Sequence, residues 1–355
     1  MSARRPPIVG RYTGEELALA GRNRGMPLEA LRHDVTPSGL HYLLIHFDIP
    51  PQPADWKLRF TGFFDRPLAL ELAEIQALPS LTLRVTMECA GNGRGQLSPR
   101  YPSVPWLEEG VSTAEWTGVP LARLLERAGL QSAAQDIVFH GADRGFDRGV
   151  EHEFARSLTP NLARGEEVLL AYAMNGEPLP PQHGAPLRLI VPRWYGMASI
   201  KWLRAVEAID RPFDGLQQAS GYHFRTAAGG KGEPCTLMRV NSLMLPPGIP
   251  DFYTRKRTVA AGRVCITGRA WSGRGRIDRV EFGVDGAWHD AVVQTQSHEQ
   301  AWQRWEATWD AEPGEHELQC RATDSTGQRQ PIDPPWDLSG FGNNGVQRLG
   351  VTVLR

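Results

Sequence analysis

The spacing of hydrophobic residues changes along this 355-residue chain, and that change limits the folds open to it. From about residue 259 onward, apolar and polar residues alternate, as in 279–284, and tight-turn sequences follow at 285–286 and 324–327. A period of two is typical of half-buried strands joined by hairpins. Short strands at this spacing favour a β-sandwich of about 120 residues at the C-terminal end.

The part of the chain before residue 212 has a mixed pattern. Helical spacing predicts short helices at 71–78 and 120–128. Two segments dense in Gly and Pro, 229–232 and 246–248, predict a connection between domains. This part of the chain is therefore expected to be an α/β or α+β domain with short helices, followed by the β-sandwich. Apolar runs bounded by Gly and Pro predict strands at 56–63, 81–87, 168–173 and 187–191.

Charge and composition disfavour several classes of protein. The 39 Lys and Arg are balanced by 40 Asp and Glu, and a formal net charge of -1 disfavours binding to nucleic acid or to an anionic membrane. No stretch approaches the ~20 apolar residues that a membrane-spanning helix needs. The N-terminus lacks the apolar core and cleavage site of a secretory signal. We expect a soluble, cytoplasmic protein with no membrane span.

The four cysteines, Cys89, Cys235, Cys265 and Cys320, are widely scattered. No Cys-x-x-Cys pair occurs, so the sequence indicates neither a disulfide scaffold nor a zinc site. A bridge between Cys265 and Cys320 is compatible with a sandwich in an oxidising compartment. Buried thiols are the favoured expectation.

A glycine-rich loop that contains Cys89 and Arg94 follows the apolar run 81–87. The loop lacks the Gly-Lys-Ser/Thr of a phosphate loop, and Gln96 occupies the third glycine position of a dinucleotide fingerprint, so both motifs are excluded. A thiolate at a strand end beside an arginine suits metal ligation or nucleophilic attack. The alternative is a buried cysteine next to a turn, and the residues alone leave both interpretations open.

Two further segments are less specific. The charged, glycine-spaced run 143–149 is expected to be a loop that either holds an anion through its arginines or is a solvated turn. The run 174–181 is typical of a hairpin turn, and His183 and Arg188 follow it without a diagnostic spacing.

Taken in their order along the chain, these segments resemble the sulfite oxidase family of molybdenum enzymes. The resemblance rests on separated motifs in one shared order: Cys89-Ala-Gly-Asn, the runs 114–121 and 171–180, His183-Gly184 and the run 200–203. It extends from about Thr36 to the C-terminus, where Trp336 begins the closing motif. It implies an α+β fold with an N-terminal extension at 1–35, a mixed α/β molybdopterin-binding catalytic domain at 36–232, and an immunoglobulin-like dimerisation sandwich at 233–355. A homodimer is therefore expected.

The resemblance also implies a cofactor and a reaction. A molybdenum ion would be held by one molybdopterin and by the Cys89 thiolate, a soft ligand that suits a metal already surrounded by sulfur. Sulfite would be oxidised to sulfate with water as the source of oxygen. Arg94 and Tyr222 match the family's substrate-side residues. The residues that match cofactor contacts are His46, Asp143, Arg144, His183, Arg188 and Lys201.

Two positions depart from the family pattern. Leu44 and Ser339 stand where the family has arginines that bind sulfite. A hydrogen bond to a charged group contributes ~1.5–3 kcal/mol, so losing two weakens sulfite binding unless Arg193, Arg225 or His223 compensates. The alternatives are therefore the same cofactor acting on a sulfane, an S-oxide or nitrate, or a cofactor-binding protein without turnover.

The family's animal members attach a haem domain. The segment before residue 36 is too short for such a domain, and the sequence has no Cys-x-x-Cys-His haem attachment. The expectation is a haem-free enzyme of bacterial type that passes electrons to a separate acceptor.

Overall fold

The computed structural model describes residues 12–230 and 232–355. Residues 1–11 of the expected N-terminal extension, and residue 231 of the expected connection, lie outside the described residues. The chain forms two compact units, each assembled from separate segments. Unit 1 contains the segment ending at Tyr42, Gly91–Thr113 and Leu237–Arg355, and unit 2 contains Leu43–Ala90 and Ala114–Thr236. The domain boundaries at 36 and 233 stay a prediction.

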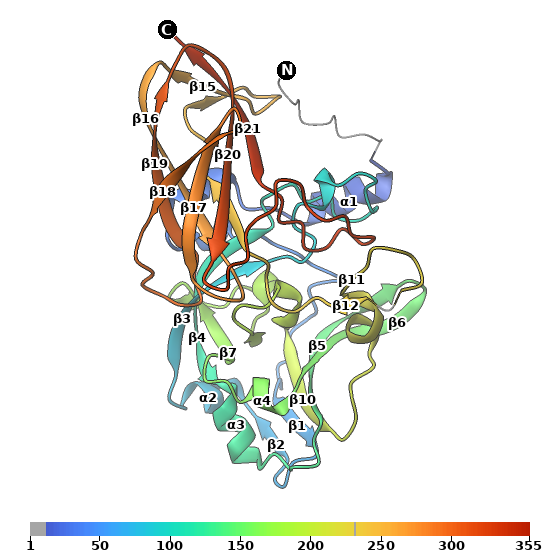
Figure 1. The fold of residues 1–355 in the computed structure, drawn as a ribbon. Helices are drawn as coiled ribbons and strands as arrows, with labels where there is room; N and C mark the ends of the chain where they lie inside the picture. The colour runs from blue at the N-terminus through green and yellow to red at the C-terminus, as the bar shows by residue number, and fades with distance from the viewer. Residues whose placement is uncertain (1–11, 231) are drawn as a thin grey trace. The chain divides into compact units, whose positions relative to one another are not determined.

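Unit 2 is built on two sheets connected by short helices (Figure 1). One sheet has the strand order β2-β1-β10-β5-β6, in which β1 and β10 are parallel and the other neighbours antiparallel. The other has the order β3-β4-β7-β8, and β9 also pairs with β7. The strands are β1 (Leu58–Gly62), β2 (Leu68–Leu70), β3 (Leu81–Glu88), β4 (Val111–Pro120), β5 (Asp136–Asp147), β6 (Val150–Leu158), β7 (Leu169–Met174), β8 (Glu177–Pro178), β9 (Arg188–Ile190), β10 (Leu203–Ile209), and the small ribbon of β11 (His223–Phe224) and β12 (Glu233–Pro234). The helices are α2 (Leu72–Gln76), α3 (Leu121–Ala128), α4 (Pro160–Ala163), the 3₁₀ turns η4 (Pro181–His183) and η5 (Gly196–Ala198), and the π-helical turn η6 (Gln217–Gly221).

Helix α3 forms where the sequence predicts a helix at 120–128. Its buried residues Leu121, Leu124, Leu125 and Ala128 recur at helical spacing and therefore share one face. Gly129 ends the helix with a φ of 72°, a conformation that glycine adopts without steric cost. The predicted helix at 71–78 is confirmed by α2, and the four predicted strands are confirmed by β1, β3, β7 and β9.

The charged run 143–149 is not the loop expected from the sequence. Strand β5 continues through Asp147, and β6 begins at Val150 after a two-residue turn. The turn residues Arg148 and Gly149 have φ angles of 53° and 78°, as the tightest hairpins require. The prediction was wrong because an exposed hairpin tolerates charged residues along its strands.

Unit 1 contains one continuous run of paired strands in the order β13-β16-β19-β18-β17-β20-β21-β15-β14. The predicted hairpin is confirmed: β17 and β18 are antiparallel, and Asp285 and Gly286 between them have φ angles of 51° and 87°. Strand β18 pairs first with β17 and then, through Val292 and Val293, with β19. The strands are β13 (Asn241–Met244), β14 (Ile249–Pro250), β15 (Arg257–Ala260), β16 (Gly262–Trp271), β17 (Ile277–Val284), β18 (Ala287–Val293), β19 (Gln303–Ala311), β20 (Gly314–Asp324) and β21 (Gln347–Leu354).

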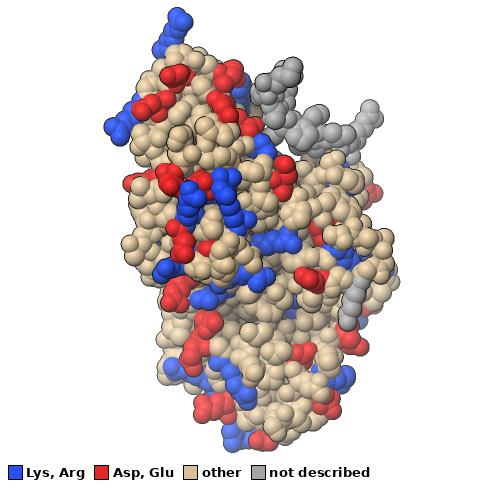
Figure 2. All heavy atoms as spheres, in the orientation of Figure 1, with Lys and Arg blue, Asp and Glu red and all other residues tan. Residues whose placement is uncertain are grey.

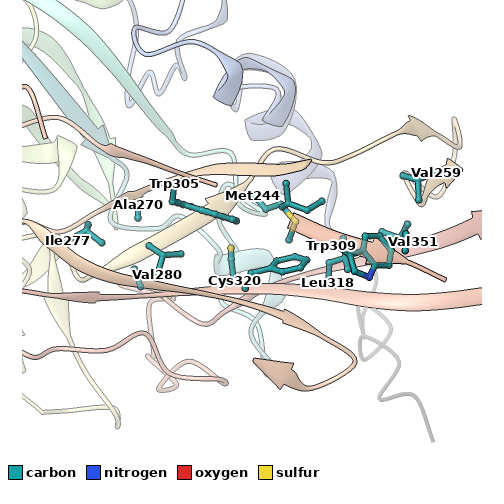
Figure 3. Packing of buried hydrophobic residues seen from close by; sticks show 14 of the residues in the cluster. Met244, Val259, Ala270, Ile277, Val280, Trp305, Trp309, Leu318, Cys320 and Val351 are labelled. Atoms are coloured by element: carbon teal, nitrogen blue, oxygen red, sulfur yellow. The ribbon is translucent and has the colours of Figure 1, made fainter. Parts of the chain in front are cut away.

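The two halves of this run face each other across a hydrophobic core, which makes a β-sandwich (Figure 3). Trp305 of β19 and Val280 of β17 are both fully buried in it. Cys320 lies in the same core, whereas Cys265 on β16 is exposed. None of the four cysteines forms a disulfide. The expectation of buried thiols is therefore confirmed for Cys89, Cys235 and Cys320 and is wrong for Cys265, which lies on the outward side of its strand.

The N-terminal part of unit 1 packs on this sandwich. The Arg269 Nε donates to the Leu31 carbonyl at 3.0 Å, and the Trp302 indole donates to the Asp34 carbonyl at 2.9 Å. Helix α1 starts with a capping box, in which Thr13 and Glu16 satisfy each other's backbone amides. The helical elements of unit 1 are α1 (Gly14–Arg22) and the 3₁₀ turns η1 (Leu28–Arg32), η2 (Ser38–Leu40) and η3 (Arg94–Gln96).

The helices and the surface charge are the features on which contact with a membrane or with a strongly charged partner would depend. Within residues 12–230 and 232–355, no helix is long and apolar enough to cross a bilayer. On the face drawn in Figure 2, Lys and Arg atoms lie among Asp and Glu atoms, in keeping with the balanced charge of the chain.

Candidate functional site

Cys89 directly follows β3, the strand that the sequence predicts before it. The last four residues of β3 are all buried, and Cys89 itself is 8% exposed. The strand neighbours β4 in its sheet, and the Arg84 Nη2 of β3 donates to the Glu115 carboxylate of β4 at 2.8 Å. The structure therefore holds the thiol at the end of a rigid element.

Arg188 lies beside the end of the same strand. Its Nη2 approaches the Met87 sulfur at 3.8 Å, two residues before Cys89. Its Nη1 donates to the His183 carbonyl at 2.8 Å, and its guanidinium stacks over the Trp116 ring at 4.6 Å. These contacts bring the two motif residues His183 and Arg188 together next to β3.

The Lys201 ammonium bridges two segments of backbone, one at Leu44 and one directly before His183. Its Nζ donates to the carbonyls of Leu44, at 2.7 Å, and Gln182, at 3.3 Å. A Cβ on Gly184 would lie 2.9 Å from the Lys201 Cβ, so glycine is needed here for the two segments to approach. Burial lowers the pKa of Lys201 to about 7, and the nearby Arg188 charge adds to the shift.

Asp143 and Arg144 are adjacent in sequence but face opposite ways. Because β5 is pleated, Asp143 is buried, whereas the Arg144 side chain is 65% exposed and pairs with Glu151 at 3.0 Å. Burial raises the pKa of Asp143 to about 7, and the Lys201 ammonium opposes that shift. The structure thus brings Asp143 near Lys201 and leaves Arg144 outside the cluster.

His46 lies in a second polar group, centred on Gln217. The Gln217 side-chain amide is 3.4 Å from the His46 Nε2 and 3.0 Å from the His152 Nε2, and it donates to Asp147 at 3.2 Å. Burial lowers the pKa of His46 to about 4, against the opposing charge of Asp147. His46 is therefore neutral at physiological pH and can act as a hydrogen-bond acceptor.

Tyr222 caps the C-terminal end of the π-helical turn η6 and is 7% exposed. The Arg156 guanidinium lies over its ring, 5.5 Å from the centroid. Arg156 is 3% exposed, and its Nη1 donates to the Gln217 carbonyl at 2.5 Å. A buried guanidinium and a buried phenol therefore meet beside η6.

Arg94 belongs to unit 1, where it is 6% exposed. Its Nε donates to the Ser339 carbonyl at 2.9 Å, and its guanidinium stacks over Phe341 at 5.2 Å. A Cβ on Gly91 or Gly340 would lie within 2.5 Å of the arginine side chain, so both glycines make room for it. Ser339, which replaces an expected arginine, thus contributes its backbone to the placement of Arg94.

The sequence analysis missed Arg156 and Gln217. Residues 154–158 of β6 are all buried, and Arg156 is the one charged side chain among them. The sequence carries no signal for this, because the segment does not alternate between apolar and polar residues. Gln217 carries no signal either, because its role depends on a turn that brings four segments together.

Two family models match the chain. The oxidoreductase molybdopterin binding domain matches residues 46–217, and the Mo-co oxidoreductase dimerisation domain matches residues 235–353. The first match contains every candidate cofactor residue named above, and the second covers the sandwich.

Individual proteins give the same result. Sulfite oxidase from Gallus gallus is 33% identical over 86% of this chain and 70% of its own length. Nitrate reductase [NADH] from Ulva prolifera is 29% identical over 89% of this chain and 40% of its own. Among solved structures, the sulfane dehydrogenase SoxCD from Paracoccus pantotrophus superposes with a TM-score of 0.80 and 26% identity, covering 99% of this chain and 92% of that one.

The share of each relative that is covered differs among these proteins. The chain spans 62% to 70% of the length of the sulfite oxidases that it matches. Its two parts match, in order, a molybdopterin-binding domain and a dimerisation domain, which confirms the α+β class and the implied cofactor. The chain belongs to the sulfite oxidase family of molybdopterin-dependent oxidoreductases.

Proposed function

We propose that this chain oxidises sulfite to sulfate at a molybdenum cofactor bound by unit 2. In balance, sulfite and water give sulfate, two protons and two electrons, and the electrons pass to a separate acceptor. The observation that carries the proposal is the position of Cys89. It follows a buried strand, and Arg188 contacts that strand two residues earlier.

The donor set fits molybdopterin, which combines an anionic phosphate with a polar pterin. Lys201 is buried, its hydrogen-bond acceptors are two backbone carbonyls, and Asp143, the carboxylate near it, does not form an ion pair with it. An anionic group beside Lys201 would supply the counter-charge that a buried ammonium needs. We assign His46, Asp143, His183, Arg188 and Lys201 to the cofactor.

The metal ligand follows from the same chemistry. Among the described residues, no three His, Cys, Asp or Glu side chains come together to bind a metal ion by themselves. A metal bound through Cys89 alone therefore needs its other ligands from a cofactor. When bound, the molybdenum cofactor supplies the two-electron redox centre and transfers the oxygen atom.

The remaining roles belong to the chain's own residues. Arg94 is presented in one orientation by Ser339 and Phe341, so little side-chain entropy is lost when it binds an oxyanion. Tyr222 offers a phenolic hydroxyl as a hydrogen-bond donor to the substrate. Both assignments rest on the matching positions of the family.

Metal and pterin analysis tests the proposal. Protein purified from a host that makes the cofactor should contain one molybdenum per chain, and the Cys89→Ser variant should lose sulfite-dependent reduction of ferricyanide. Cys265→Ser is the matched control. The Cys265 thiol is exposed on the sandwich, so this substitution should change neither the molybdenum content nor the rate of ferricyanide reduction. Native protein without molybdenum or pterin would refute the enzyme assignment.

A second candidate function keeps the cofactor and changes the substrate. Leu44 and Ser339 replace two expected arginines, and the relatives include a sulfane dehydrogenase and a nitrate reductase. Fully loaded protein that does not oxidise sulfite but turns over a sulfane, an S-oxide or nitrate would support this candidate. Loaded protein inactive on all four would support a cofactor-binding role without turnover.

We propose further that two copies form a homodimer through residues 233–355, following the catalytic domain at 36–232, and that the protein is cytoplasmic. The match of residues 235–353 to a dimerisation domain supports the assembly. Light scattering at micromolar concentrations should give twice the 39.4 kDa mass of the chain, and a monomer there would refute the dimer. Cell fractionation tests the location.

A further inference from the structure

Arg156 is a buried cation that the proposed cofactor set does not use. Its side chain is buried on β6, and the π-helical turn η6 packs against the same strand. Among the described residues it makes one hydrogen bond, from Nη1 to the Gln217 carbonyl. Its Nε and Nη2 protons are therefore available for another acceptor.

No negative charge in the described part of the chain balances this guanidinium. Burial lowers the pKa of Arg156 to about 10, so it stays protonated at neutral pH. The titratable groups that act on it are Tyr222 and Cys235, and no described carboxylate forms an ion pair with it. A buried charge is costly unless an opposite charge accompanies it, which indicates that an anion completes the site.

The neighbouring groups favour a small oxyanion. The planar guanidinium can donate two parallel hydrogen bonds from Nε and Nη2 to two oxygens of one anion. The ring of Tyr222 lies under the guanidinium, so the phenol belongs to the same surroundings. The positions of Leu44 and Ser339 carry no guanidinium, and Arg225 donates to the Ser220 and Gly230 carbonyls instead.

We propose that Arg156, together with Tyr222, forms an oxyanion-binding subsite that takes sulfite, and its product sulfate, by bidentate hydrogen bonding. This inference rests on the proposed function and names the residue that compensates for the two missing arginines. Gln217 is a positioning residue, because its carbonyl fixes Nη1 and leaves the other donors for the anion.

The experiment uses full-length, molybdenum-loaded protein and three variants. Arg156→Met removes the charge and keeps much of the side-chain volume, whereas Arg156→Lys keeps the charge. Arg148→Met is the matched control, because Arg148 also donates to a carbonyl of η6, that of Ser220, but its side chain is 45% exposed. Sulfate binding is measured by calorimetry at constant ionic strength, beside the KM for sulfite and the molybdenum and pterin contents.

We expect Arg156→Met to raise both the Kd of sulfate and the KM of sulfite by about tenfold or more, with the cofactor content unchanged. Arg156→Lys keeps the charge but cannot make the bidentate pair, so it should raise both values by less than Arg156→Met does, and Arg148→Met should stay within about twofold of the native protein. If Arg156→Met does not fold, Arg156→Gln compared with Arg156→Lys makes the same test of charge.

Three results separate the hypotheses. Unchanged sulfate and sulfite affinities in folded, loaded Arg156→Met would overturn the subsite while leaving sulfite oxidation intact. Loss of molybdenum and pterin from Arg156→Met would also overturn it, because the anion would then be the cofactor phosphate. Sulfate binding that depends on Arg156, in protein that does not oxidise sulfite, would support the subsite and refute the proposed reaction.

Discussion

Gly184 offers a direct test of how closely the segment of His183 must approach Lys201. Gly184 has a φ of 110°, and a Cβ there would lie 2.9 Å from the Lys201 Cβ and 3.0 Å from its Cα. In Gly184→Ala, the backbone conformation costs about 1–2 kcal/mol, and the overlap with a fixed part of Lys201 adds about 1–3 kcal/mol. We expect a total destabilisation of about 2–5 kcal/mol.

Gly176→Ala separates the two contributions. Gly176 has a φ of 80° in the β7–β8 turn, and a Cβ there would meet no atom within 4 Å. This variant should therefore lose only the backbone part, about 1–2 kcal/mol. Urea denaturation followed by tryptophan fluorescence gives the free energy of unfolding of both variants.

Gly184→Ala is also expected to weaken cofactor binding. A displaced Lys201 cannot keep its hydrogen bonds to Leu44 and Gln182, so Gly184→Ala should retain less molybdenum and pterin than Gly176→Ala. Equal stability and equal cofactor content in the two variants would refute the argument that the close approach at Gly184 matters.

Three further outcomes are expected. Trp305→Ala should cost about 3–5 kcal/mol of unfolding free energy in urea, because the indole is fully buried in the sandwich core; a loss below about 1 kcal/mol would contradict the packing. Burial alone would raise the pKa of Glu153, but hydrogen bonds from His140 and Arg204 lower it to about 2. Glu153 therefore stabilises the native state above its unfolded pKa of about 4.3 and loses that effect as pH falls toward about 2, so Glu153→Gln should flatten the stability profile in this window. A thiol reagent should label one cysteine per native chain rapidly, and Cys265→Ser should abolish that fast phase; persistence of the phase would show that another thiol is accessible.

The sequence predicted those elements whose pattern depends on burial. The strand before Cys89 and helix α3 were found because their apolar residues follow the period of a sheet and of a helix. The charged hairpin at 143–149 was not found, since an exposed strand has no apolar alternation to reveal it. The exposed position of Cys265 was missed because the expectation rested on the general tendency of cysteine to be buried, although Val264 and Ile266 on either side of it contact the core.

The candidate site was only partly visible in the sequence. Motif order led to Cys89, His183 and Arg188, and the contact of Arg188 with Met87 brings these segments together in one sheet region. Arg156 and Gln217 lie 61 residues apart and belong to no shared motif. Their proximity is produced by β6 and the π-helical turn, and such long-range pairing cannot be derived from local periodicity.

The division of the chain into interleaved segments has a consequence for how this protein can be cut. In unit 1, Arg269 and Trp302 donate hydrogen bonds to the carbonyls of Leu31 and Asp34, more than 230 residues earlier in the chain. A gene fragment encoding the C-terminal third would lack these acceptors and expose apolar surface to aggregation. Unit 1 is therefore expected to reach its native structure only after the ribosome has synthesised residues 237–355, although residues 31–34 are made much earlier.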